Sequence, residues 1–120
     1  MNRIEYIPGD LVNTLFGIAK ITNVYKEGSY DFEGKSFSGS DTCEPIPLTP
    51  EILEKNGWKK ERIYYTNKFI PRIKLCTCEE GYEDKWSVSI NGDIIGGYIY
   101  HVHQLQHILF GLGLDSNIKL

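Results

Sequence analysis

Three prolines within six residues set the strongest constraint on how this chain can fold. They lie in the segment 44–50 and are Pro45, Pro47 and Pro50. Each proline lacks the backbone N–H that a helix interior or a central strand needs, and it holds the preceding residue in an extended conformation. The segment therefore predicts an extended connection between two units, residues 1–47 and 48–120, which we expect to pack as one compact domain.

The apolar composition favours strands over a helical bundle. Fifteen of the 120 residues are isoleucine and only Ala19 is alanine, and β-branched side chains suit a pleated surface. In residues 1–47, short apolar stretches alternate with turn signals such as 8–10 and 26–28. Strands that short, with glycine at the corners, are typical of a small bent barrel. We therefore predict an α+β fold whose first unit is an SH3-like β-barrel.

The proline segment leads into a short predicted helix and a hairpin. Thr49 is a good N-cap and Pro50 suits the first helical position, which places a helix at about residues 50–56. Two strand-like runs, residues 61–66 and 69–78, then flank a turn at 67–68, and they predict a hairpin at about residues 61–78.

A second hairpin and an amphipathic helix are predicted for the rest of the chain. Asn91-Gly92 supplies the positive φ angles of a type I′ turn, which predicts a hairpin at about residues 86–99. From about residue 101 to 112 the apolar period becomes helical. The residues on that helical face, which we expect to pack on the sheet, are Val102, Leu105, Ile108, Leu109 and Leu112.

Three histidines fall within seven residues, at His101, His103 and His107. His103 and His107 are four residues apart and share the helix face opposite the apolar one. Such a pair could supply two metal ligands, but tetrahedral zinc needs four, and the spacing of Cys76 and Cys78 is not that of a zinc knuckle. We therefore predict no metal and no cofactor, and we interpret the two histidines as solvated or as part of an interface.

The sequence carries none of the short motifs of nucleotide binding or serine nucleophiles, so we predict that the protein is not an enzyme. It has only three cysteines, an odd number that does not fit a disulfide framework, so we expect reduced thiols. No apolar run approaches the roughly 18 residues that cross a membrane, and the first ten residues are too polar for a secretory signal. We expect a cytoplasmic protein with no membrane partner.

Charge is unevenly distributed within the net charge of −3. Residues 58–74 hold six bases against the single acid Glu61, interleaved with aromatic side chains. Bases beside aromatic rings suit phosphate contact and base stacking. The alternative, favoured by the acidity of the whole chain, is a solvated strand face whose charges oppose aggregation. The candidate nucleic-acid-binding residues are Lys59, Lys60, Arg62, Tyr64, Arg72 and Lys74.

Three blocks of the sequence resemble a family. They are residues 3–12, which contain Gly9-Asp10-Leu11-Val12, residues 46–58, and residues 100–106 with Phe110. Their order and spacing are similar to those of short uncharacterised proteins of anaerobic gut bacteria, their phages and mobile elements. That family has no established activity, so the resemblance implies an accessory protein without catalytic residues. The first block and residues 16–21 also resemble the barrel modules of bacterial transcription factors.

Two functional hypotheses follow from these observations. The first is a non-enzymatic phage or mobile-element accessory protein that acts as a protein-interaction module. It would present His103, His107 and Phe110, or the barrel surface, to a partner that could be a second copy of the chain. The alternative is a nucleic-acid-binding protein that uses the basic aromatic hairpin 58–74.

Overall fold

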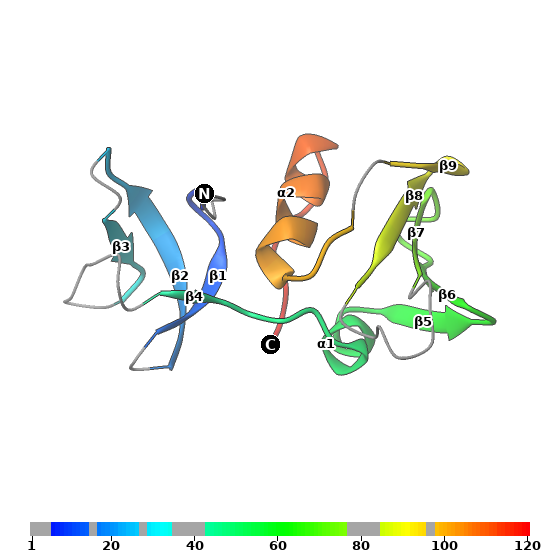
Figure 1. Ribbon diagram of the computed structural model, residues 1–120, viewed down its shortest axis with the longest axis horizontal. Coiled ribbons are helices and arrows are strands. Elements are labelled where there is room, and N and C mark those ends of the chain that lie inside the picture. The colour runs from blue at the N-terminus through cyan, green and yellow to red at the C-terminus, as the bar shows by residue number, and fades with distance from the viewer. Residues whose placement is uncertain (1–5, 15–16, 27–28, 35–42, 77–84, 96–97) are drawn as a thin grey trace.

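The computed structural model shows two antiparallel sheets with a helix between them (Figure 1). It describes residues 6–14, 17–26, 29–34, 43–76, 85–95 and 98–120. The predicted α+β class is confirmed by the two sheets and two helices. Cys78 and the glycines at 96–97 lie outside the described residues.

The N-terminal sheet has four strands in the order β3-β2-β1-β4. Their bounds are Leu11–Thr14 for β1, Gly17–Val24 for β2, Tyr30–Phe32 for β3 and Glu44–Pro45 for β4. One face buries a small core of Tyr6, Val12, Ala19, Ile21 and Phe32. Within the described ranges no strand pairing closes this sheet into a barrel, so the SH3-like barrel stays a prediction.

The C-terminal sheet has five strands in sequence order, each paired with the next. Their bounds are Trp58–Glu61 for β5, Tyr64–Asn67 for β6, Ile73–Cys76 for β7, Ser87–Ile90 for β8 and Asp93–Ile94 for β9. The turn at Asn91 and Gly92 has the two positive φ angles, 54° and 88°, that the sequence predicts.

Several strand boundaries of the predicted hairpin 61–78 differ from the sequence-based expectation, since β6 begins at Tyr64 and β7 begins at Ile73. The run 61–66 was expected to be a single strand, but the chain reverses at Arg62, whose φ is 58°, and Glu61 pairs with Tyr64. The tight turn lets Trp58 start a strand of its own, in which that ring is only 3% exposed. Burial of the indole therefore outweighs the strain of a non-glycine residue with positive φ.

The two helices begin and end within a residue of their predicted ranges. Helix α1 spans Pro50–Lys55, and the Thr49 Oγ1 accepts a hydrogen bond from the Ile52 N–H at 3.3 Å. Helix α2 spans Val102–Gly111, and the Gln104 Oε1 accepts from the backbone N–H groups of Tyr100 and His101 at 2.7 and 3.0 Å. A side chain thus satisfies a donor of the first turn in α1, and in α2 a side chain of the first turn satisfies the two donors just before the helix.

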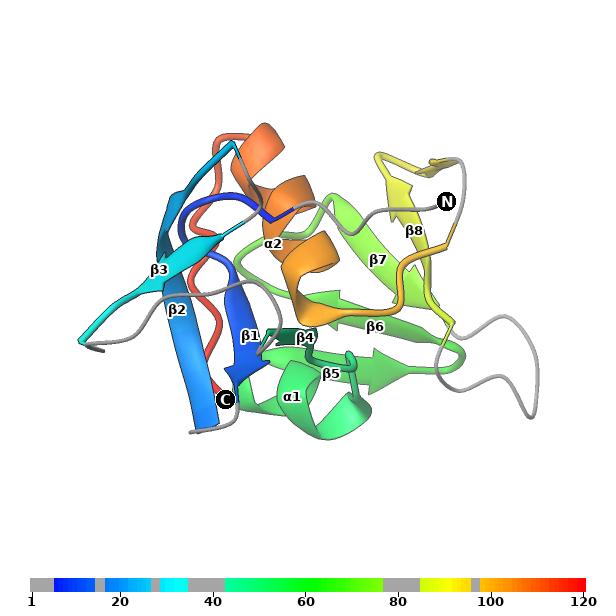
Figure 2. The same cartoon turned by 60° about the vertical axis from the view of Figure 1, so that its left-hand side comes forward.

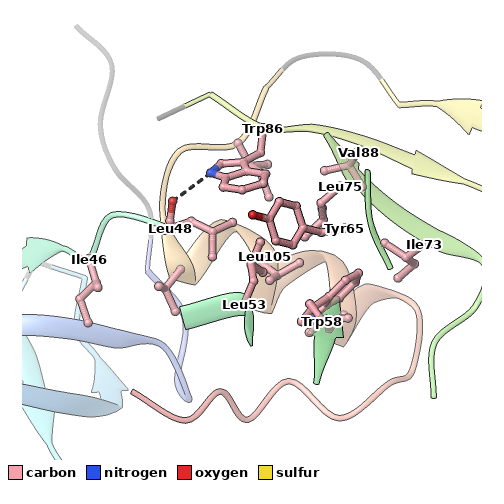
Figure 3. Packing of buried hydrophobic residues seen from close by; sticks show 13 residues of the cluster. Ile46, Leu48, Leu53, Trp58, Tyr65, Ile73, Leu75, Trp86, Val88 and Leu105 are labelled. Carbon is pink, nitrogen blue, oxygen red and sulfur yellow. Dashed lines mark hydrogen bonds between the residues drawn. The ribbon is translucent and has the colours of Figure 1, made fainter. Parts of the chain in front are cut away.

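The larger core lies between the C-terminal sheet and the two helices (Figure 3). Trp86 is fully buried, and its Nε1 donates to the Leu48 carbonyl at 2.9 Å. The predicted apolar face of α2 points into this core, with Leu105 at 1% and Leu109 at 4% exposed. The proline segment is tied to the start of α2, because the Val102 N–H donates to the Ile46 carbonyl at 2.8 Å.

Helix α2 lies between the two sheets in both views (Figures 1 and 2). No residue from 101 to 109 is fully exposed, so the helix is covered on more than its apolar face. None of the helices in the described ranges is long and apolar enough to span a membrane.

Candidate functional site

The C-terminal sheet packs its inner face on the helices, and its other face, here called the outer face, carries basic, aromatic and hydroxyl side chains. Strand alternation sets this division, since in β6 Tyr65 and Asn67 are buried whereas Tyr64 is exposed and Thr66 is half-buried. The strand register then aligns one row across four strands. That row, from β5 to β8, is Lys59, Thr66, Lys74 and Ser89.

Two lysines, one on β7 and one in the turn after β6, lie against exposed aromatic rings. The Lys74 Nζ is 5.5 Å from the ring centroid of Tyr64, and the Lys68 Nζ is 5.0 Å from that of Phe69. Tyr64 is 39% exposed and Phe69 is 78% exposed. These cation–π contacts hold a positive charge beside a ring that is accessible to a further planar group.

Two shallow hollows flank Lys74, which lines both. The first has a volume of about 420 Å³, and its lining includes Tyr64, Ser87, Ser89 and Ile94. The second has a volume of about 550 Å³, and its lining includes Lys59, Lys68 and Phe69 together with the acidic Glu61. The outer face thus offers two concave sites that share Lys74 in their linings.

The structure brings together only part of the basic set that the sequence singled out. Lys59, Tyr64 and Lys74 share the outer face. Lys60 pairs with Tyr65, so alternation directs it to the other face of β5, whereas Arg62 and Arg72 are exposed in turns. Sequence reasoning missed the hydroxyl and apolar groups of the second hairpin, although the alternation of serine and apolar residues at 87–90 could have indicated them.

A second polar cluster lies buried between α2 and the N-terminal sheet. Asp10 is 1% exposed; its Oδ2 accepts from the Ile7 N–H at 2.9 Å and lies 2.7 Å from the His107 Nε2. Burial raises the pKa of Asp10, and the hydrogen bonds from Ile7 and His107 oppose that rise. This pair joins two segments 97 residues apart in the sequence.

His103 is the most buried histidine of this cluster, at 4% exposed. Its ring lies 4.9 Å from that of Tyr6, and its Nδ1 has no hydrogen-bond partner among the described residues. Burial, followed by the nearby His107 and His101, lowers its pKa from 6.5 to about 4. The ring is therefore neutral at physiological pH.

The expected solvated or interfacial helix face is thus covered from within the chain. His103 packs against Tyr6, His107 pairs with Asp10, and only Phe110 of the three proposed interface residues is exposed, at 66%. The physical reason is that each buried polar group on this face except the His103 Nδ1 has a partner, which removes most of the cost of burial.

Gln106 explains how this helix face can be polar and buried. Its Oε1 accepts from the Leu11 N–H at 2.9 Å, while its Nε2 donates to the carbonyls of Gly9 and Ser116, each at 3.0 Å. The segments around Gly9 and around Gln106, which are 97 residues apart in the sequence, therefore meet at one contact between helix and sheet.

The buried cluster offers little to metal or nucleophilic chemistry. No group of three His, Cys, Asp or Glu side chains in the described ranges is arranged to hold a metal ion. Burial raises the pKa of the half-buried Cys43 to about 11, against the hydrogen bond from Tyr6. This thiol is therefore protonated at neutral pH, the state in which it is a weak nucleophile.

Comparisons of the chain with models of protein families, with curated proteins and with solved structures found no match.

Proposed function

We propose that the protein is a non-enzymatic nucleic-acid-binding protein and that the outer face of its C-terminal sheet is the binding surface. The observation that carries this proposal is the exposed group formed by Lys59, Tyr64 and Lys74, in which the Lys74 Nζ lies 5.5 Å from the Tyr64 ring centroid. Phosphate contact needs the lysines, and base stacking needs an accessible ring.

The local charge supports the same proposal. All six bases of 58–74 are exposed, and Glu61 is the single acid within that segment. A surface on which bases outnumber acids attracts an anionic polymer even when the net charge of the protein is −3. Helix α2, the surface of the first hypothesis, is largely covered from residue 101 to 109, which favours the sheet over the helix as the contact surface.

The test is a salt-dependent binding measurement with matched charge variants. Fluorescence anisotropy of a labelled oligonucleotide should show binding at about 50 mM salt that weakens steeply by about 200 mM. The double variant Lys59→Glu, Lys74→Glu should abolish binding. The control Lys26→Glu, Lys119→Glu changes the net charge equally at exposed sites outside the hairpin, and it should bind nearly as well as the wild type. Absence of binding at low salt, or equal loss in both variants, would contradict the proposal.

The second candidate is a protein-interaction module of a phage or mobile element, located in the cytoplasm. The observation that favours it is Phe110, which is 66% exposed near the end of α2. Its test is sedimentation at rising protein concentration with Phe110→Ser as the variant. Self-association that Phe110→Ser removes would support this candidate. A strict monomer would exclude the homodimer.

A further inference from the structure

Resting on the proposed function, we propose that the outer face takes single-stranded rather than duplex nucleic acid. Two neighbouring bases occupy the hollows on either side of Lys74, one against Tyr64 and the other against Phe69. Lys74 lines both hollows, and its ammonium group meets the phosphate that links the two nucleotides.

The width of the site requires an unstacked strand. Neighbouring β-strands lie about 4.8 Å apart, so the row from Lys59 on β5 to Ser89 on β8 is about 14 Å wide. Bases stacked in a duplex are only about 3.4 Å apart along each strand. Two adjacent bases can therefore reach separate hollows only when they no longer stack on each other.

The side chains of each hollow match the exposed parts of an unpaired base. Tyr64 presents a ring face in the first hollow, and the hydroxyls of Ser87 and Ser89 can donate to and accept from base edges there. Phe69 presents a ring in the second hollow, and Lys59 lines that hollow as a further phosphate contact. In a duplex the faces of the bases stack on neighbouring bases, and their pairing edges are hydrogen-bonded to the other strand. Neither is then available to the protein.

The lysines on this face outnumber the acidic Glu61, which favours a polyanion as the occupant, and the exposed rings favour one with planar groups. An acidic peptide would use Lys59 and Lys74 but would gain little from Tyr64 and Phe69. Substitution of Tyr64 or Phe69 by alanine therefore distinguishes a ligand that stacks its bases on these rings from one that binds by charge alone.

The experiment compares a labelled twelve-nucleotide thymidine strand with the same strand annealed to its complement, by anisotropy at about 50 mM salt. We expect the single strand to bind more tightly, and Tyr64→Ala and Phe69→Ala each to weaken it roughly tenfold or more. Both side chains are exposed, so these variants should fold, which circular dichroism checks. The control is Phe110→Ala, an exposed ring on α2, which should leave the affinity unchanged.

The outcomes separate this inference from the proposed function. If neither oligonucleotide binds, the proposed function itself fails. If the lysine variants lose binding while the duplex binds as tightly as the single strand and the ring variants bind normally, the surface binds nucleic acid but the inference is overturned. Displacement of the strand by poly-glutamate at equal charge concentration would also overturn it, because the face would then recognise charge alone.

Discussion

The buried His103 is expected to make the stability of the fold depend on pH. Its pKa is about 4 in the folded protein and 6.5 when solvated, so between these values the unfolded chain binds more protons than the folded one. The free energy of unfolding must then fall as the pH falls through this window. From pH 7 to pH 5 the expected loss is about 2 kcal/mol, and by pH 4 it reaches about 3 kcal/mol.

The groups around His103 also contribute to the pH dependence of stability, in both directions. Burial lowers the pKa of His101 as well, which adds to the loss. The raised pKa of Asp10 acts in the opposite direction, because protonation removes the cost of burying its charge as the pH falls through that pKa. Burial raises the pKa values of Tyr6 and Cys43, so both stay protonated throughout the acid range.

The assay is urea denaturation at pH 7, 6 and 5, followed by fluorescence of the buried Trp58 and Trp86. The variant His103→Gln does not titrate, so its unfolding free energy should change with pH by about 2 kcal/mol less than that of the wild type. His103→Phe keeps a ring of similar size and serves where the glutamine variant fails to fold at pH 7. Equal pH dependence in the wild type and in a folded variant would refute the reasoning.

Three further substitutions test individual contacts and one turn of the fold. Gln106→Leu leaves the Leu11 N–H without its partner, so urea denaturation should show a loss on the order of 2–3 kcal/mol. Trp86→Phe removes the donor to the Leu48 carbonyl and leaves a cavity, and a loss of about 2–4 kcal/mol in the same assay is expected. Gly92→Ala places a side chain at a φ of 88°, and thermal unfolding should show a cost of about 1 kcal/mol.

Local signals in the sequence predicted the elements but not the second buried face of α2. The N-cap at Thr49 and the turn at Asn91-Gly92 depend on only a few neighbouring residues, so each could be predicted from the local sequence. His103 and Gln106 could not, because polar residues on a helix are expected to face water. Their burial depends on partners such as Leu11, 95 residues away from Gln106, and no local pattern reports such a pairing.

The sequence indicates which segment is basic and aromatic, but it does not indicate which side chains of that segment share the outer face. The composition of residues 58–74 is basic and aromatic, yet the segment contains a turn at Arg62 without the glycine, proline or asparagine that usually indicates one. That turn makes β5 a separate strand, and alternation then separates Lys59 from Lys60. Lys74 joins Lys59 only through the register of three strands, which residue composition alone does not specify.

The contacts of α2 also bear on where a partner can bind. Its apolar face is occupied by the C-terminal sheet, and Gln106 and His107 hold its polar face to the N-terminal sheet. A partner that needed the middle of this helix would have to displace the buried hydrogen bonds and leave groups such as Asp10 without partners, at a cost of several kcal/mol. Binding to the outer face of the C-terminal sheet requires no such rearrangement, because Lys74 and Tyr64 are already exposed and in contact. A ligand that binds there should therefore leave the pH dependence due to His103 unchanged, whereas a ligand of the helix should alter it.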